Sequence, residues 1–422
     1  MSDYRTSSPL PGDRLELLCR LSREFSSSLD LGEVLYRVMD EVIAAVHAER
    51  GFIMLHDEAG GLVFRVARGM DQATIEAPQF EISRGVVEEV ARDSRAVLTG
   101  NAQRDPRFNM RESVNLLSLR SILCVPLVTR HRKLGAIYVE NRLQAGVFTE
   151  ADLDLLSSLA ASAAIAIENA NLYLMAVEKG RLERELQMAH DIQAGLLPRR
   201  TPQVPGWEFA VHWQPARQVA GDFYDFIEMD GGLGLVIADV SGKGVPAALF
   251  MAVSRSIVRG SVGRSPRPAE CIAHANRLIC VDSSGGMFVT LFFGCLDPAA
   301  HTLTYVNAGH NPPLLYQAAR NVLTELSRTA MALGVYEDAP LEQEQIRLEP
   351  GDRLVLYTDG VTDAMDSQDN PFGAQRFREL ILENRAASAT EIVDRVTQSI
   401  RSFAGDGEPF DDIAIVVVSC LK

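Results

Sequence analysis

The 422-residue sequence has few of the residues that build disulfide or zinc frameworks. Its six cysteines are scattered without a CxxC pair, and its eight histidines show neither HExxH nor HxH spacing. A disulfide scaffold and a zinc cluster are therefore not predicted. We expect most of the cysteines to be small, buried hydrophobic side chains.

The sequence also lacks long apolar runs and an excess of positive charge. No segment approaches the ~20 apolar residues that a membrane-spanning helix needs. The N-terminus has no basic region followed by an apolar one, which a signal peptide would require. We therefore expect a cytoplasmic protein without a membrane segment. The formal net charge of −15 disfavours nonspecific nucleic-acid binding and makes a bound cation easier to accommodate.

What is present is an ordinary globular composition arranged in four parts. Residues 1–14 are predicted to be a flexible N-terminus, and residues 15–170 mix helix and strand patterns. Residues 171–198 continue a long helix, and residues 199–422 contain short strand patterns interrupted by helices. This order predicts a multidomain α/β (α+β) protein whose C-terminal half is a sandwich rather than alternating βαβ units.

The first domain shows strand patterns at 51–55, 62–67, 121–127 and 134–140, with helix patterns at 14–46 and 85–93. A turn is expected at 57–61 and an irregular stretch at 105–108. A long helix then opens at Thr149, with Asp152 in the reciprocal capping position.

Residues 15–170 resemble a GAF domain, a small sensory α/β module. The resemblance rests on Gly85-Val86-Val87 and on the segments SILCVPLV, LGAIYVEN and FTEADLDLLSSLAASAAIAIENANLY. It specifies the fold better than a ligand, so a small-molecule pocket and a purely dimerising or transmitting domain both stay open. Cys124 lies in the middle of a predicted strand, where attachment of a tetrapyrrole would be surprising.

An apolar stripe with charged residues on the other faces continues the long helix through residues 171–198. It predicts a short coiled coil between the two halves, and with it a homodimer. The alternative is a helix packed along one domain. Proline ends the helix at Leu197-Pro198. The stripe consists of Leu172, Val177, Leu182, Leu186, Ala189, Ile192 and Leu196.

Four short acidic stretches in the second half indicate one divided metal site. Each places an aspartate at the end of an apolar, strand-like run, beside a glycine or another acid. Converging carboxylates raise one another's pKa unless a cation lies among them, and hard divalent ions with oxygen ligands meet that need. Taken singly, each acid has a simpler reading as a turn, cap or surface residue. The stretches are 221–225, 238–244, 357–360 and 411–414.

Residues 199–422 resemble the SpoIIE/RsbU-type branch of the PP2C-like (PPM) serine/threonine phosphatases. The segments AGDFYD, ADVSGKGVPAALFM, NAGHNPPLL, LYTDGVTDA and DDIAIVVV occur in the family's order. The resemblance implies two packed antiparallel sheets flanked by helices, with two Mn²⁺ or Mg²⁺ ions at one edge. Ala220 and Ala414 depart from the family's usual residues beside the ligands.

The resemblance also assigns roles around that centre. Asp222 and Asp239 would bind the metal pair, Asp239 bridging both ions, and the Val240 carbonyl would complete one coordination sphere. Asp359 and Asp411 would bind on the opposite side. Asp412 is the weaker candidate there, because adjacent strand residues point to opposite faces.

Two further residues are candidates for handling the substrate phosphate. Arg217 could bind it with its bidentate guanidinium group or could simply be solvated. His310 could act as a general acid, although Gly309 and two prolines explain its segment equally well as a rigid turn, with Asn307 and Asn311 orienting a loop.

These features predict a GAF-regulated, metal-dependent protein serine/threonine phosphatase that hydrolyses its substrate with metal-activated water and without a phospho-enzyme. The resemblance implies that the substrate is a phosphorylated STAS-type anti-sigma-factor antagonist. A catalytically degenerate phosphatase fold that serves as a signalling scaffold is the alternative, and a small-molecule phosphatase is a third reading.

Overall fold

The computed structural model describes residues 11–25, 27–57, 59–75, 83–106, 120–142, 145, 147–283, 286–405 and 409–421. Residues 1–10, and parts of the turn expected at 57–61 and of the irregular stretch expected at 105–108, lie outside this set. Helix α1 begins at Pro11, within the N-terminus predicted to be flexible. The chain divides into two compact units, residues 1–181 and 182–422.

The N-terminal unit contains one five-stranded antiparallel sheet with the strand order β2-β1-β5-β4-β3. Four of these strands lie where the sequence predicts them, and the short β3 is an addition. The elements are α1 Pro11–Phe25, α2 Leu31–Val46, β1 Arg50–His56, β2 Leu62–Gly69, α3 Arg84–Asp93, β3 Val97–Thr99, β4 Ser121–Val128 and β5 Lys133–Asn141.

Both faces of this sheet are covered by helices, so its strands are apolar on both sides. Helices α1, α2 and the first part of α5 (Glu150–Leu196) pack on one face, around residues such as Ile53 and Ile137. Helix α3 packs on the other, against Phe52 and Tyr138. Cys124 is buried on the α3 side, and this burial raises the pKa of its thiol.

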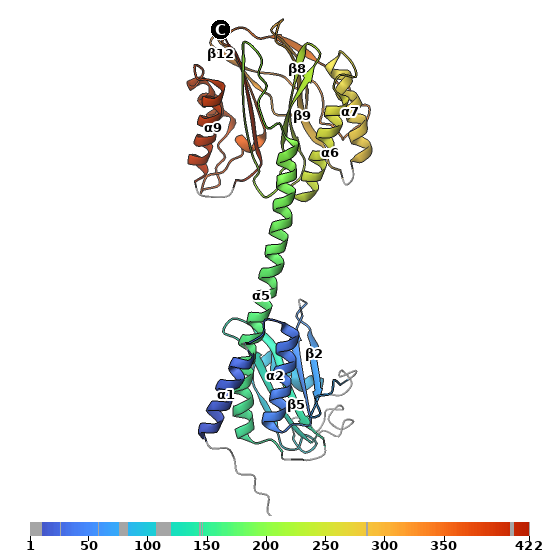
Figure 1. Cartoon of the computed structure of the whole chain (residues 1–422), viewed down its shortest axis with the longest axis vertical. Helices are drawn as coiled ribbons and strands as arrows, with labels where there is room; N and C mark the ends of the chain where they lie inside the picture. The colour runs from blue at the N-terminus through green and yellow to red at the C-terminus, as the bar shows by residue number, and fades with distance from the viewer. Residues whose placement is uncertain are drawn as a thin grey trace, which may run out of the picture. The chain divides into compact units, whose positions relative to one another are not determined.

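Helix α5 is a single helix of 47 residues that runs from one unit into the other (Figure 1). Thr149 and Asp152 form the expected reciprocal cap: the Thr149 amide donates to Asp152 Oδ2 at 2.9 Å, and the Asp152 amide donates to Thr149 Oγ1 at 3.4 Å. Against the expectation from sequence, α5 is long and apolar enough to pass a length-and-composition test for a membrane span. Its first turns, however, bury Leu156, Leu159 and Ile167 in the core of the N-terminal unit.

The C-terminal unit contains two five-stranded antiparallel sheets, with the orders β13-β10-β9-β8-β7 and β12-β11-β14-β15-β6. The strands are β6 Trp207–Gln214, β7 Phe223–Met229, β8 Gly232–Val240, β9 Val289–Asp297, β10 Thr302–Ala308, β11 Leu314–Gln317, β12 Val322–Glu325, β13 Glu344–Arg347, β14 Arg353–Tyr357 and β15 Ile413–Cys420. The sequence missed the short β12 and β13.

Helices flank the two sheets on opposite sides (Figure 1). Helices α6 and α7 pack against the first sheet, and α8 and α9 against the second. The main core lies between the sheets and includes Phe292 and Val416, one from each. The helices are α6 Val245–Ser261, α7 Pro268–Asp282, α8 Ala374–Glu383 and α9 Ala389–Ala404, and a short 3-10 helix, η2, spans Asp359–Val361. This is the predicted flanked sandwich.

Candidate metal centre

The predicted aspartates lie at the ends of strands from both sheets. Asp222 directly precedes β7, and Asp239 is the penultimate residue of the neighbouring β8. Asp359 follows β14, and Asp411 and Asp412 precede the neighbouring β15. The antiparallel pairing within each sheet therefore brings together aspartates that are far apart in the sequence.

Close backbone approach explains why glycines stand beside these acids. A Cβ atom on Gly360 would lie 1.9 Å from the backbone oxygen of Asp412. One on Gly221 would lie 3.1 Å from the carbonyl oxygen of Val240, the predicted backbone ligand. Any larger residue at 360 would push apart the two segments that carry Asp359 and Asp411.

The aspartates are close enough to repel one another. Burial, and then the charges of Asp239 and Asp412, raise the pKa of Asp222 well above its usual range. Burial and the charge of Asp359 raise the pKa of Asp239 to about 7. Burial and the charge of Asp411 raise the pKa of Asp359. These shifts show that the four separate stretches converge on one electrostatic cluster.

Two carboxylates of this cluster, those of Asp411 and Asp412, have hydrogen-bond or ion-pair partners in the protein. Asp412 accepts hydrogen bonds from the backbone amides of Ala216 and Gly221, both at 2.7 Å. Asp411 forms an ion pair with Lys243, whose Nζ lies 2.8 Å from Oδ2. Within the described residues, no three His, Cys, Asp or Glu side chains are already placed as a ready-made metal site.

The residues nevertheless fit divalent metal ions chemically. The donors are carboxylate oxygens and a backbone carbonyl, which are the ligands that Mg²⁺ and Mn²⁺ prefer. Asp222 is 2% exposed, and its Oδ2 atom is buried without a hydrogen-bond partner. A buried carboxylate oxygen without a partner is costly, and a cation would satisfy it.

The simpler reading of Asp239 as a helix cap does not hold. The N-cap of α6 is Gly244, and no side chain caps this helix. Asp239 lies instead near the C-terminal end of β8, close to the other carboxylates. Its position is therefore not explained by helix geometry.

Sequence reasoning missed Lys243 as a member of this site. It lies between Gly242 and Gly244, which have φ angles of 94° and 78°. Its charge also lowers the pKa of Asp359, although burial outweighs this effect. The signal was visible: one basic residue stands between two glycines in the loop that follows Asp239.

The two predicted phosphate-handling residues lie in other surroundings. Arg217 is exposed and lines a hollow of about 700 Å³ with Gln187 and His190 of α5. His310 is 1% exposed, and its Nδ1 lies 2.8 Å from Thr290 Oγ1. Burial lowers the pKa of His310 to about 3. A neutral imidazole offers no imidazolium proton at pH 7, so the geometry favours the structural reading of this segment.

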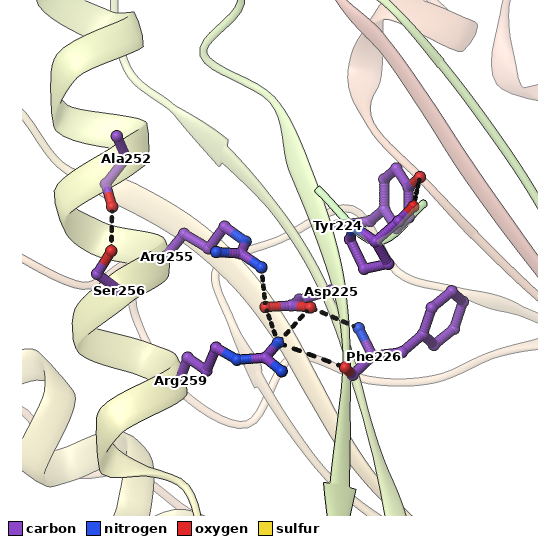
Figure 2. Close-up of polar contacts among 8 residues, drawn as sticks. Tyr224, Asp225, Phe226, Ala252, Arg255, Ser256 and Arg259 are labelled. Carbon is purple, nitrogen blue, oxygen red and sulfur yellow. Dashed lines mark hydrogen bonds and ion pairs between the residues drawn. The ribbon is translucent and has the colours of Figure 1, made fainter. Parts of the chain in front are cut away.

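Asp225, three residues after Asp222, is paired with the side chains of Arg255 and Arg259 (Figure 2). Its buried carboxylate lies 2.9 Å from Arg255 Nη2 and 2.8 Å from Arg259 Nη1. Both arginines belong to α6. The two ion pairs fasten α6, and with it the Lys243 loop, to β7.

The end of α5 contacts the loop before Asp222. The Gln193 side chain is 5% exposed. Its Nε2 donates to the Ala220 carbonyl at 2.8 Å, and its Oε1 accepts from the Ala220 amide at 3.0 Å. Nε2 also lies 3.3 Å from the Ala248 carbonyl oxygen in α6. One side chain thus joins the helix to two segments that frame the cluster.

Comparison with known proteins identifies both domains. Residues 229–421 match the family of stage II sporulation protein E (SpoIIE), and residues 28–168 match the GAF domain. Protein IcfG of Synechocystis sp. (strain ATCC 27184 / PCC 6803 / Kazusa) is 33% identical over 270 residues, covering 57% of this chain and 42% of IcfG. Phosphoserine phosphatase RsbU of Bacillus subtilis (strain 168) is 29% identical over 237 residues, covering 56% of this chain and 70% of RsbU.

Solved structures support the fold. The SiaA-PP2C domain of Pseudomonas aeruginosa superimposes with a TM-score of 0.53 at 22% identity, covering 57% of this chain and 98% of that domain. The chain spans less than half of IcfG, so these matches describe domains rather than the whole relative. Residues 28–168 are thus a GAF domain by family match, and residues 229–421 match the SpoIIE family and lie in a unit with a PP2C-like fold.

Proposed function

We propose that this protein is a metal-dependent protein serine/threonine phosphatase whose activity is regulated by its GAF domain. The observation that carries the proposal is the convergence of Asp222, Asp239, Asp359 and Asp411 at one edge of the sandwich, where burial and neighbouring carboxylate charges raise the pKa of the first three. The similarity to phosphoserine phosphatase RsbU supports phosphoserine as the substrate chemistry.

In the proposed site, Asp222 and Asp239 bind from the first sheet and Asp359 and Asp411 from the second, with the Val240 carbonyl as a further ligand. Bound divalent ions supply an activated water and neutralise phosphoryl charge. Asp412 orients the loop that carries Asp222 through its two backbone hydrogen bonds. Since no serine or cysteine nucleophile is needed, hydrolysis is direct.

Regulation is proposed to pass along α5. This helix is continuous from the core of the GAF domain to Gln193, whose side chain binds the loop before Asp222. Its middle part exposes apolar side chains, including Leu172, Val177 and Leu182. Burying these in a second copy would form the predicted coiled coil and homodimer. The GAF domain would receive the signal, as a small molecule or through its partner.

Hydrolysis of p-nitrophenyl phosphate tests the enzymatic proposal. We expect activity that depends on Mn²⁺ or Mg²⁺ and that Asp239→Asn abolishes. Phosphopeptides should be better substrates than phosphorylated metabolites. If the wild-type protein hydrolyses no phosphate ester with any divalent metal, the degenerate scaffold becomes the better explanation.

The proposed partner is a cytoplasmic phosphoprotein, of the STAS-type anti-sigma-factor antagonist class that the family resemblance implies. Capture of phosphorylated proteins with the Asp239→Asn variant tests this, because a variant that binds without hydrolysis should retain its substrate. Enrichment of an unrelated phosphoprotein class would contradict the STAS assignment while leaving the enzymatic proposal intact.

A further inference from the structure

The ammonium group of Lys243 has three contacts at the rim of the carboxylate cluster. Its Nζ lies 2.8 Å from Asp411 Oδ2 and donates a hydrogen bond of 3.1 Å to the Phe410 carbonyl oxygen. It also lies 4.7 Å from the centroid of the Phe410 ring, in cation–π geometry. These contacts come from the segment just before β15, whereas Lys243 itself follows β8.

The ion pair between Lys243 and Asp411 is weak enough for Lys243 to exchange this partner for another anion. The side chains of Lys243 and Asp411 are 45% and 31% exposed, and ion pairs this exposed are held weakly because water screens them. The flanking Gly242 and Gly244 have no atom within 4 Å of an added Cβ. The loop that carries Lys243 is therefore not wedged between neighbours at these two positions.

The charge of the cluster calls for a basic group. Five carboxylates lie together here, from Asp222, Asp239, Asp359, Asp411 and Asp412. Their formal charge exceeds that of two divalent ions even before a phosphate dianion enters. Binding a phosphate ester at such a site requires additional positive charge close to the phosphoryl oxygens.

We propose that Lys243 is the side chain that binds the phosphoryl group of the substrate, with Asp411 as its exchangeable partner when no phosphate is bound. This inference rests on the proposed function and names a residue in it. A lysine ammonium is a compact charge on a flexible stem, suited to moving between a carboxylate and a phosphate. A divalent ion on Asp411 would compete with Lys243 for the same carboxylate, which favours that transfer.

The competing assignment is Arg217, which the sequence suggested. In the part of the chain that the structure describes, no recorded ion pair joins Arg217 to any of the five aspartates. Its surroundings are instead Gln187 and His190 of α5. The two assignments can be separated because they predict opposite results for single substitutions.

The test compares Lys243→Gln, Lys243→Arg and Arg217→Gln in the full-length protein. Arg264→Gln is the charge control. Arg264 is exposed and donates a hydrogen bond to the Gly260 carbonyl at the end of α6, so its replacement removes one positive charge outside the cluster. For each variant, the inhibition constant of inorganic phosphate against p-nitrophenyl phosphate is measured. Mn²⁺ affinity is measured separately, by electron paramagnetic resonance of the free ion.

We expect Lys243→Gln to weaken phosphate binding about tenfold, the size of one lost charge-assisted hydrogen bond. Its Mn²⁺ affinity should be unchanged or higher, because a competitor for Asp411 is gone. Lys243→Arg should retain most of the phosphate affinity.

Unchanged phosphate affinity in Lys243→Gln would overturn the inference. So would a loss of Mn²⁺ affinity in that variant, since Lys243 would then be supporting Asp411. A loss of phosphate affinity in Arg217→Gln alone would move the role to Arg217. If the wild-type protein hydrolyses nothing with any metal, the proposed function fails as well; normal wild-type activity with an unaffected Lys243→Gln variant overturns this inference only.

Discussion

Gln193 and Ala220 exchange two hydrogen bonds, at 2.8 and 3.0 Å, and thereby join the last turn of the long helix to the loop that leads into Asp222. The partners are 27 residues apart in the sequence, and the bonds are buried. A rotation of α5 could not leave both bonds intact. This pair therefore connects the end of α5 directly to the segment that carries Asp222.

Replacing Gln193 by alanine should release that loop. We expect a loss of about 1–3 kcal/mol of stability, because the buried Ala220 amide and carbonyl lose their partners, and a severalfold drop in Mn²⁺-dependent hydrolysis. Gln187→Ala is the matched control, since Gln187 is an exposed residue of the same helix. Equal activity in the two variants would show that the Gln193 contact does not influence the site.

Inserting two alanines after Arg181 should uncouple the domains. Two residues rotate everything beyond them by about 200° around the helix axis. The stripe of exposed apolar residues before the insertion would then face away from the stripe after it. We expect a changed basal rate and no response to the GAF signal. Light scattering of the same variant would show whether its dimerisation also weakens, and unaltered regulation would exclude coupling through α5.

Removing the buried charge of Asp225 should be strongly destabilising. Asp225→Asn leaves Arg255, which is 11% exposed, without its carboxylate partner, and breaking such a buried pair costs about 3–5 kcal/mol. Arg259→Ala should cost less, because its side chain is 47% exposed and Arg255 still neutralises Asp225. Urea unfolding followed by tryptophan fluorescence measures both, since Trp207 and Trp213 are the only tryptophans and both belong to the C-terminal unit. A smaller loss for Asp225→Asn than for Arg259→Ala would contradict the clamp.

His310 should make the C-terminal unit sensitive to acid. Burial lowers its pKa from 6.5 to about 3, and the charge of Arg328 acts in the same direction. Between these pH values the unfolded chain binds a proton that the folded protein excludes, so stability falls as the pH drops below 6.5. The loss from this group is about 2 kcal/mol between pH 6.5 and 5. In His310→Asn this part of the pH dependence should vanish; an identical pH profile would show that folding does not lower the pKa of His310.

Much of the fold could be predicted because its elements are locally encoded. The apolar run of β8, the proline near the start of α6 and the Thr149–Asp152 cap all mark element boundaries in the sequence. Strands β12 and β13 were missed because each has only four residues, of which one in β12 and none in β13 is buried. Their pairing with β11 and β10 depends on neighbours that no local pattern specifies.

The convergence of the acids was predicted from their positions at the ends of apolar, strand-like runs, and the family resemblance added the role of each. The roles of Asp412 and Lys243 depend on loop geometry instead. Asp412 precedes β15, and its carboxylate accepts hydrogen bonds from the backbone amides of Ala216 and Gly221, nearly 200 residues away in the sequence. Lys243 reaches Asp411 across a similar gap in sequence. Contacts of this range are set by how the sheets pack, and sequence spacing alone does not reveal them.

The five acids of the cluster come from both layers of the sandwich, Asp222 and Asp239 from one sheet and Asp359, Asp411 and Asp412 from the other. A cation bound by acids from both sheets would link the two layers. The unfolded chain cannot assemble this set of ligands, so the metal binds only the folded protein. Tighter metal binding therefore increases the free energy needed to separate the sheets. Chelation should accordingly loosen the sandwich as a whole, well beyond the edge where the ion resides.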